Sequence, residues 1–257
     1  RLSCKTTVAT GSTKTQPGAA YGAETNAGVA ATNLRSSSIR RMDNFNYTWD
    51  NQIDMKHTFG DDHDFSLLLL QSQYYTEDVS SYSYSNGQPF DTGIYNIGSG
   101  LPTSYQINSG YAKKTLNSFA GRLNYAYKGK YLLTASTRYD GSSVLSEGNK
   151  WTNFPSVALG WRISKESFLE NNNIVSDLKL RASLGYTGND NVEPYTTQAY
   201  LNQQTFYANG ANLVSGWQTT ALANSNLTWE KTRELNFGLD FGFLRNRITG
   251  TVDVYDR

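Results

Sequence analysis

The stretch NSFAGRLNYAYKGKYLLTASTRY, residues 117–139, decides the fold class of this chain. On both sides of Lys128-Gly129-Lys130, apolar or aromatic residues alternate with small or polar ones. A period of two places these two sets of side chains on opposite faces of a β-strand. We therefore predict a hairpin with a tight turn at 128–130, one apolar face and one polar face.

The same alternation recurs in six other segments, so the sequence predicts eight strands in all. The predicted strands cover residues 44–59, 65–77, 117–127, 131–139, 153–163, 177–187, 229–241 and 247–254. Short connections at 60–64, 128–130, 164–176 and 242–246 alternate with long ones at 1–43, 78–116, 140–152 and 188–226. Barrels of bacterial outer membranes have short periplasmic turns and longer extracellular loops. One up-and-down assignment places every connection accordingly.

Aromatic residues lie at both ends of the predicted apolar face. At the short turns they are Phe59, Phe65, Tyr127, Tyr131, Trp161 and Phe241; at the long loops they are Phe45, Tyr47, Tyr75, Phe119, Tyr139, Tyr186 and Trp229. A barrel that spans a membrane carries such girdles at both interfaces, whereas a soluble β-sandwich has no reason to. We predict an all-β fold, an antiparallel up-and-down transmembrane β-barrel segment of about eight strands. The alternatives are a soluble sandwich and a small barrel closed by these eight strands alone.

Composition excludes several other classes of function. Lysine and arginine number 23 against 22 aspartate and glutamate, so no nucleic-acid partner is predicted. The single cysteine, Cys4, allows no intrachain disulfide. No segment has the length of a transmembrane helix. The chain starts at Arg1 without a signal peptide, which indicates a segment of a longer protein.

Catalytic and metal chemistry have few candidate residues. His57 and His63 are the only histidines, and neither lies in a motif with a serine. Together with Cys4 they do not provide the ligand spacing of a zinc site. Oxygen-rich runs at 61–64 and 189–191 lack the calcium-loop pattern, so solvated turns are the favoured interpretation. No enzyme activity, cofactor or metal is predicted.

Charged side chains on the polar face have two interpretations. Arg138, Arg162, Lys179 and Arg181 share that face in the predicted register. They can contact a plug or a polar solute, or they can pair with Glu230, Glu234, Asp240 or Asp253 on neighbouring strands. Pairing is favoured, because charges in a barrel lumen need partners.

The long loops carry the candidates for contact with a substrate or a partner. Aromatic faces stack on sugar rings and pack against proteins, and they also pack within their own loops. The candidates are Tyr82, Tyr84, Phe90, Tyr95, Tyr105, Phe206, Tyr207 and Trp217.

Three stretches resemble the SusC/RagA family of TonB-dependent outer-membrane transporters. The first is RYDGSS at 138–143, followed by Trp151 and FPSVALGWRIS at 154–164. The second is SDLKLRASLGYTGN at 176–189, and the third is NLTWEKT at 226–232 with NFGLDF at 236–241 and NRITG at 246–250. The resemblance is firm over 117–257, plausible over 44–77 and absent from 1–40 and the long loops.

The resemblance implies a parent barrel of about 22 strands with a plugged lumen. It also implies a SusD-like surface lipoprotein as a lid, TonB acting through a plug that this chain lacks, and oligosaccharides or peptides as substrates. The implied location is the outer membrane of a Gram-negative, Bacteroidetes-like cell, with lipid around the barrel. Within the chain we expect an extracellular loop at 1–43 and a barrel segment at 44–257.

The alternative function is an extracellular β-rich domain that binds glycan or protein. A charge at Leu123, Leu180 or Leu239 discriminates between the two functions. It blocks membrane insertion of a barrel but only destabilises the core of a soluble domain.

Overall fold

The computed structural model describes residues 1–26, 34–169, 172, 174–210 and 212–257. Within them the chain forms twelve strands and three short 3-10 helices. The strands are β1 (Leu2–Thr15), β2 (Gly18–Tyr21), β3 (Ser36–Phe59), β4 (His63–Asn86), β5 (Gln106–Tyr127), β6 (Tyr131–Ser142), β7 (Trp151–Arg162), β8 (Val175–Asn189), β9 (Tyr200–Asn209), β10 (Asn212–Ala221), β11 (Glu230–Phe243) and β12 (Ile248–Asp256). The helices are η1 (Ile97–Ser99), η2 (Pro102–Ser104) and η3 (Ile163–Lys165). No helix in the described ranges is long and apolar enough to cross a membrane.

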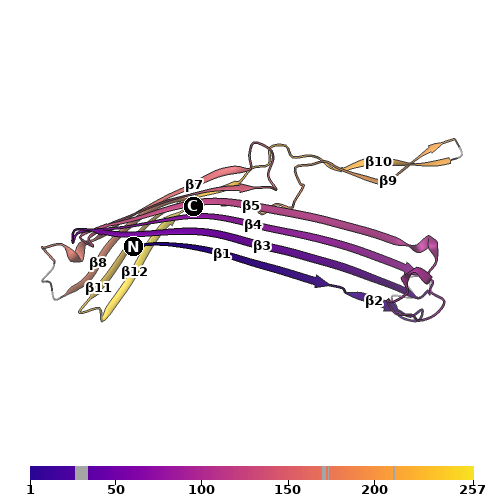
Figure 1. Ribbon diagram of the computed structural model, residues 1–257, viewed down its shortest axis with the longest axis horizontal. Coiled ribbons are helices and arrows are strands. Elements are labelled where there is room, and N and C mark those ends of the chain that lie inside the picture. Colours follow the sequence, from indigo (N-terminus) through magenta and orange to yellow (C-terminus); the bar gives the residue numbers. More distant parts are fainter. Residues whose placement is uncertain (27–33, 170–171, 173, 211) are drawn as a thin grey trace. The chain divides into compact units, whose positions relative to one another are not determined.

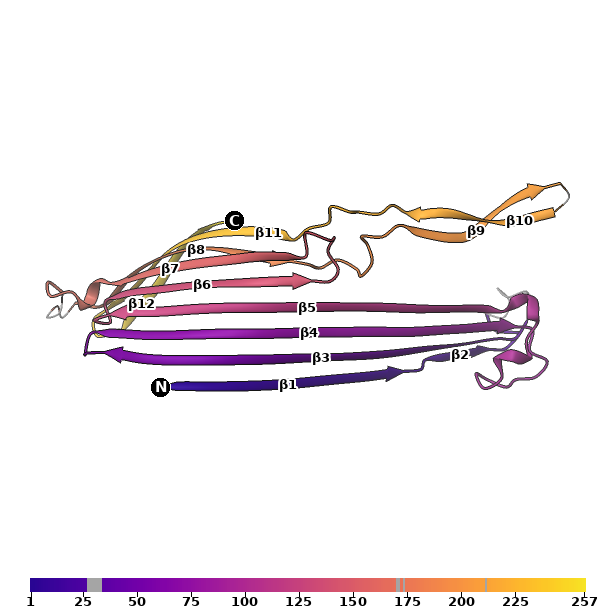
Figure 2. The same ribbon diagram turned by 45° about the horizontal axis from the view of Figure 1, so that its top comes forward.

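The strands form one large sheet and one separate hairpin, as Figure 1 and Figure 2 show. The order in the large sheet is β1-β3-β4-β5-β6-β7-β8-β11-β12, with β2 paired to β3. From β5 to β8 each strand pairs antiparallel with the next, and so do β9 with β10 and β11 with β12. β1 and β2 both pair with β3, and β8 pairs with β11 across the β9–β10 hairpin. The sheet is not closed, because β1 and β12 lie at its two ends. The predicted all-β antiparallel fold is confirmed.

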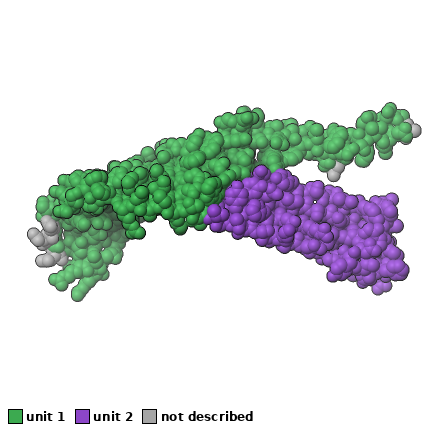
Figure 3. All heavy atoms as spheres, viewed as in Figure 1, with its two compact units in different colours: residues 1–7, 49–73, 115–257 green, residues 8–48, 74–114 purple. Residues whose placement is uncertain are grey.

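The chain divides into two compact units, which Figure 3 shows in different colours. Unit 1 comprises residues 1–7, 49–73 and 115–257, and unit 2 comprises 8–48 and 74–114.

The strand register in unit 1 separates an apolar face from a polar face. One row of cross-strand partners runs Tyr125, Leu133, Leu159, Ala182, Phe237 and Val254. The row one residue away runs Asn124, Thr134, Ala158, Ser183, Asn236 and Tyr255. Most large side chains of the apolar row are exposed. This is the division that the alternating sequence predicts.

A small buried core lies in unit 1 at the ends of β7, β8 and β11. Val144, Leu145, Phe154 and Trp229 form it, and Leu116, Val192 and Leu227 pack against it. The rings of Phe154 and Trp229 meet edge to face with centroids 5.3 Å apart. A Cβ at Gly188 would collide with the Phe154 ring, so the core requires glycine there.

Trp229 was predicted to belong to the outward aromatic girdle, and this is wrong. Its side chain is only 6% exposed, and its indole Nε1 donates to the carbonyl oxygen of Lys150 at 2.9 Å. The connection between β6 and β7 folds over the end of the sheet and covers this ring. The alternation along one strand cannot predict that a loop from elsewhere in the chain buries one of its side chains.

The strands are longer and more numerous than predicted. Residues 1–43 are not a loop, because β1, β2 and the start of β3 lie there. The predicted loop at 78–116 contains the end of β4 and the start of β5, which leaves 87–105 as the connection. The predicted long loop at 188–226, for which the sequence allows a short strand near 198–207, contains β9 in that region and also β10. These strands have polar residues on both faces and therefore no period-two signal.

Candidate functional site

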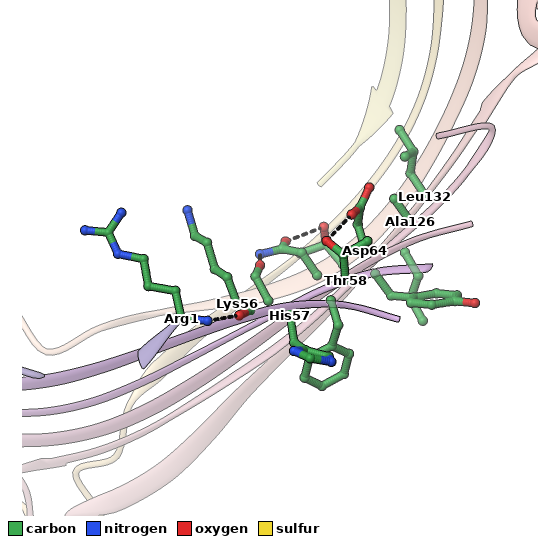
Figure 4. Close-up of a pocket in the computed structure, with 13 residues that line it drawn as sticks. Arg1, Lys56, His57, Thr58, Asp64, Ala126 and Leu132 are labelled. Atoms are coloured by element: carbon green, nitrogen blue, oxygen red, sulfur yellow. Dashed lines mark hydrogen bonds between the residues drawn. The ribbon is translucent and has the colours of Figure 1, made fainter. Parts of the chain in front are cut away.

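The polar face of unit 1 is hollowed near its short turns (Figure 4). The hollow has a volume of about 640 Å³ and is lined from β3, β4, β5 and β6. Lys56 and Asp64 point to one side of the sheet and His57 to the other. Thr58 donates its hydroxyl to Asp64 Oδ1 at 2.8 Å. Arg1, which precedes β1, lines the hollow on the same side as Lys56, so this wall presents two cations, a carboxylate and hydroxyls.

Hydrogen bonds continue this polar surface from strand to strand. Asn124 Nδ2 donates to Ser66 Oγ at 3.1 Å, and Thr134 donates to Asn124 Oδ1 at 2.9 Å. Further along, the hydroxyls of Ser136 and Ser156 lie 2.7 Å apart. Neutral donors and acceptors of this kind suit contact with water, a polar solute or another polar protein surface. They do not supply a nucleophile paired with a base.

Arg181 is the centre of the ion pairs on the polar face. Its Nε and Nη2 each lie 2.9 Å from an oxygen of Asp240, and Nη2 lies 3.0 Å from Asp253 Oδ1. Gly238 leaves the room, because a Cβ there would lie 2.6 Å from Nη2. The predicted pairing with neighbouring strands is confirmed for Arg181. Arg138 differs, since it pairs with Asp140 of its own strand at 2.7 Å.

Arg181→Met is expected to lower the free energy of unfolding by about 1–2 kcal/mol, because it leaves two carboxylates together without their shared cation. The three side chains are roughly one-third exposed, so solvent screening limits the loss. Denaturant unfolding of the refolded protein in detergent measures it. Arg122→Met is the matched control, because Arg122 lies on the same polar face, opposite Ser136, and no ion pair of it occurs among the described residues. Adding Asp253→Asn to Arg181→Met should recover part of the loss, and a failure to recover would contradict the pairing.

A second polar cluster lies at the short-turn end of unit 1. Glu166, which follows η3, accepts hydrogen bonds from Tyr131 Oη at 2.7 Å and Trp161 Nε1 at 3.0 Å. Lys130 Nζ lies 3.3 Å from its other oxygen. The indole donor, the phenol and the Lys130 ammonium together hold the pKa of Glu166 below its ordinary value of 4.5.

The Glu166 bonds should be lost only in acid. A lowered folded-state pKa contributes stability that is complete above the unfolded value of 4.5 and disappears as pH falls through the lower folded value. We expect indole fluorescence to change below pH 4.5 in the native protein and not in Glu166→Gln. Glu147→Gln, in an exposed loop, is the control and should titrate like the native protein.

The two histidines have aromatic neighbours. The ring of His57 lies 4.2 Å from that of Phe59, and His63 Nδ1 lies 2.7 Å from Tyr125 Oη. Among the described residues no group of three metal-ligating side chains occurs.

Five of the eight aromatic candidates lie in unit 2. Tyr82 and Tyr84 are on β4, not in a loop, and the Arg40 guanidinium lies 5.4 Å from the centre of the Tyr82 ring. Phe90 and Tyr95 are exposed, Tyr95 to 92%. Tyr105 donates a hydrogen bond from its hydroxyl to the Gly98 carbonyl at 2.7 Å. This side chain therefore stabilises the connection at 87–105 to which it belongs.

The other three candidates lie on the β9–β10 hairpin of unit 1. Phe206 is opposite Ser215 and Tyr207 is opposite Val214, while Trp217 lies at an irregularity in the register. All three rings are exposed, Trp217 to 66%. No charged residue occurs between 194 and 229. Val192 precedes the hairpin and Leu227 follows it. Both side chains pack on the buried core, so the two ends of the segment that contains the hairpin are anchored there.

Sequence reasoning missed two parts of the arrangement. Glu166 was placed in a polar connection, with no signal that it accepts from two girdle aromatics. The Phe154–Trp229 core was missed because its members come from distant segments. The FPS and NLTW motifs mark both positions, but only as a family resemblance.

Comparison with known proteins gives consistent matches. The family model described as TonB dependent receptor-like, beta-barrel matches residues 6–257. TonB-dependent receptor P26 of Formosa agariphila is 36% identical over 222 residues, which are 86% of this chain and 22% of the relative. TonB-dependent receptor SusC of Bacteroides thetaiotaomicron is 47% identical over 151 residues, 56% of this chain and 15% of the relative.

Solved structures agree with these matches. The structure of the RagAB peptide transporter superposes with a TM-score of 0.86 at 25% identity, over 99% of this chain and 28% of that chain. This chain therefore spans at most 28% of the length of each of these relatives.

Proposed function

The chain belongs to the TonB-dependent receptor-like β-barrel family, and from this premise we propose that it forms part of the wall of an outer-membrane importer. The observation that carries the proposal is the superposition of nearly the whole chain on a transporter structure. The relatives are named as receptors and a transporter, which fits a function without bond chemistry. The whole importer would take up a bulky nutrient through conformational gating.

The apolar face of unit 1 would face lipid and the polar face would line the lumen. Exposed leucine, valine and aromatic side chains on the first face, and cross-strand hydrogen bonds on the second, support this orientation. The turns at 60–62, 128–130 and 244–247 would lie in the periplasm. The β9–β10 hairpin and the connection at 87–105 would lie outside the cell.

The partners would be a SusD-like lipoprotein and TonB, the latter acting through a plug in the rest of the parent protein. The substrate would be an oligosaccharide or a peptide. The relative SusC and the RagAB peptide transporter are the reason for these assignments.

Detergent extraction of the native protein tests the placement. We expect a detergent-dependent species several times heavier than the 28.6 kDa of this chain, in the outer-membrane fraction and together with a lipoprotein. A soluble species near 28.6 kDa would overturn the proposal and favour an extracellular binding domain.

Trp217→Ala in the full-length protein is expected to weaken lipoprotein binding at least about tenfold, because exposed tryptophans are typical interface anchors. Co-purification with a tagged lipoprotein measures the change. Thr219→Ala on the same strand is the control and should bind normally. Equal retention by both variants would assign the hairpin to another role.

A further inference from the structure

The apolar face of unit 1 contains a groove. Its volume is about 580 Å³, and side chains from β6, β7, β8, β11 and β12 line it. The groove runs over Ala182, which is the small member of the row between Leu159 and Phe237. Leu159, Leu180 and Phe237 stand exposed around it. The groove therefore exists because the small side chain of Ala182 lies between the larger side chains of its neighbours.

One end of the groove meets the polar cluster at the short turns. Tyr131 and Trp161 line this end, and both donate to Glu166. The stacked rings, with centroids 6.5 Å apart, thus have an apolar body in the groove and a polar edge outside it. This is how aromatic side chains lie at the interface between acyl chains and headgroups.

Lysine side chains gather beside the same end. Lys130 Nζ lies 3.3 Å from Glu166, and a Cβ on Gly129 would lie 2.9 Å from Lys165 Nζ. Lys128 pairs with Asp62 at 3.5 Å. Three lysines thus face two carboxylates, a net charge of about +1 at neutral pH. Within the described residues, no carboxylate forms an ion pair with Lys165.

We propose that the groove binds one glycerophospholipid with an anionic headgroup. An acyl chain lies over Ala182, and the phosphate lies against Lys165 and Lys130 beyond the Tyr131–Trp161 pair. The apolar lining matches the chain and the positive cluster matches the headgroup, as basic pockets at membrane interfaces do. The source is the bilayer, since the groove opens on the face that we assign to lipid. The inference rests on the proposed outer-membrane placement.

Native mass spectrometry of the full-length protein from mild detergent tests the site. The probes are phosphatidylglycerol and phosphatidylcholine of equal chain length. We expect one phosphatidylglycerol to be retained, with a preference over phosphatidylcholine of at least about fivefold. Ala182→Phe fills the groove and should lower retention of both lipids at least about tenfold, because several methylene contacts are lost. Lys130→Ala with Lys165→Ala should abolish only the preference.

Ala135→Phe is the matched control. Ala135 lies on the same apolar face, opposite Val157, but outside the groove. The variant should retain phosphatidylglycerol like the native protein. Equal loss in Ala135→Phe and Ala182→Phe, or no retention by a natively folded membrane protein, would overturn the lipid site alone. Recovery of the native protein in the soluble fraction would overturn the membrane placement itself.

Discussion

Leu123→Arg should prevent most of the full-length protein from assembling in the outer membrane. Leu123 lies midway along the part of β5 that alternates, on the apolar face, and its cross-strand partner is Ala135. A cationic side chain on the lipid face of a barrel costs about 2–4 kcal/mol near the bilayer midplane. This corresponds to a change of about 30-fold or more in the assembly equilibrium.

The folded fraction in isolated outer membranes, seen as a heat-modifiable band on a gel, measures this effect. Asn124→Arg is the control, one residue further along β5 and on the polar face. It loses the hydrogen bonds to Ser66 and Thr134 but keeps the charge in water, so we expect it to cost about 1 kcal/mol or less. Similar losses in both variants would mean that the two faces do not meet different solvents.

Trp229→Ala should open the end of the sheet where the buried core lies. Truncation of a buried aromatic side chain costs about 3–5 kcal/mol. The change also removes the indole donor from the Lys150 carbonyl and the edge of the ring from Phe154. The expected result is rapid hydrogen exchange and proteolytic cleavage in the connection at 143–150, while β5 and β6 stay protected.

The control for this core variant is Phe206→Ala on the exposed hairpin. Its ring is 62% exposed, so removing it should change local stability by about 0.5 kcal/mol or less. Unchanged protection of 143–150 in Trp229→Ala would show that the core does not hold this connection in place.

The alternation at 117–139 predicted its hairpin well, because each strand there has one face against apolar surroundings. The same pattern in the later segments correctly assigned the two faces of β7, β8, β11 and β12. The segments 36–43, 78–86 and 106–116 gave no such signal, since polar residues occupy both faces and pairing with neighbouring strands alone makes them strands. Their strand structure depends on partners far along the chain.

Some contacts of individual side chains could be predicted from the sequence and others could not. Pairing of Arg181 followed from charges of opposite sign on adjacent strands. The burial of Trp229 and the bonds to Glu166 depend on how connections fold back over strand ends, which no local pattern encodes. The eight aromatic candidates rest on their position in the predicted long loops and on the tendency of aromatic faces to stack on sugars and proteins. Contact of these residues with a partner stays a prediction.

The absence of charge between residues 194 and 229 has a consequence for kinetics. A contact surface without ions gains nothing from long-range attraction, so its rate of encounter with a partner should be nearly independent of ionic strength. Association would then proceed at the ordinary rate of about 10⁵–10⁷ M⁻¹s⁻¹, and affinity would reside in slow dissociation. An uncharged β9–β10 hairpin therefore suits a partner that stays bound through many rounds of uptake.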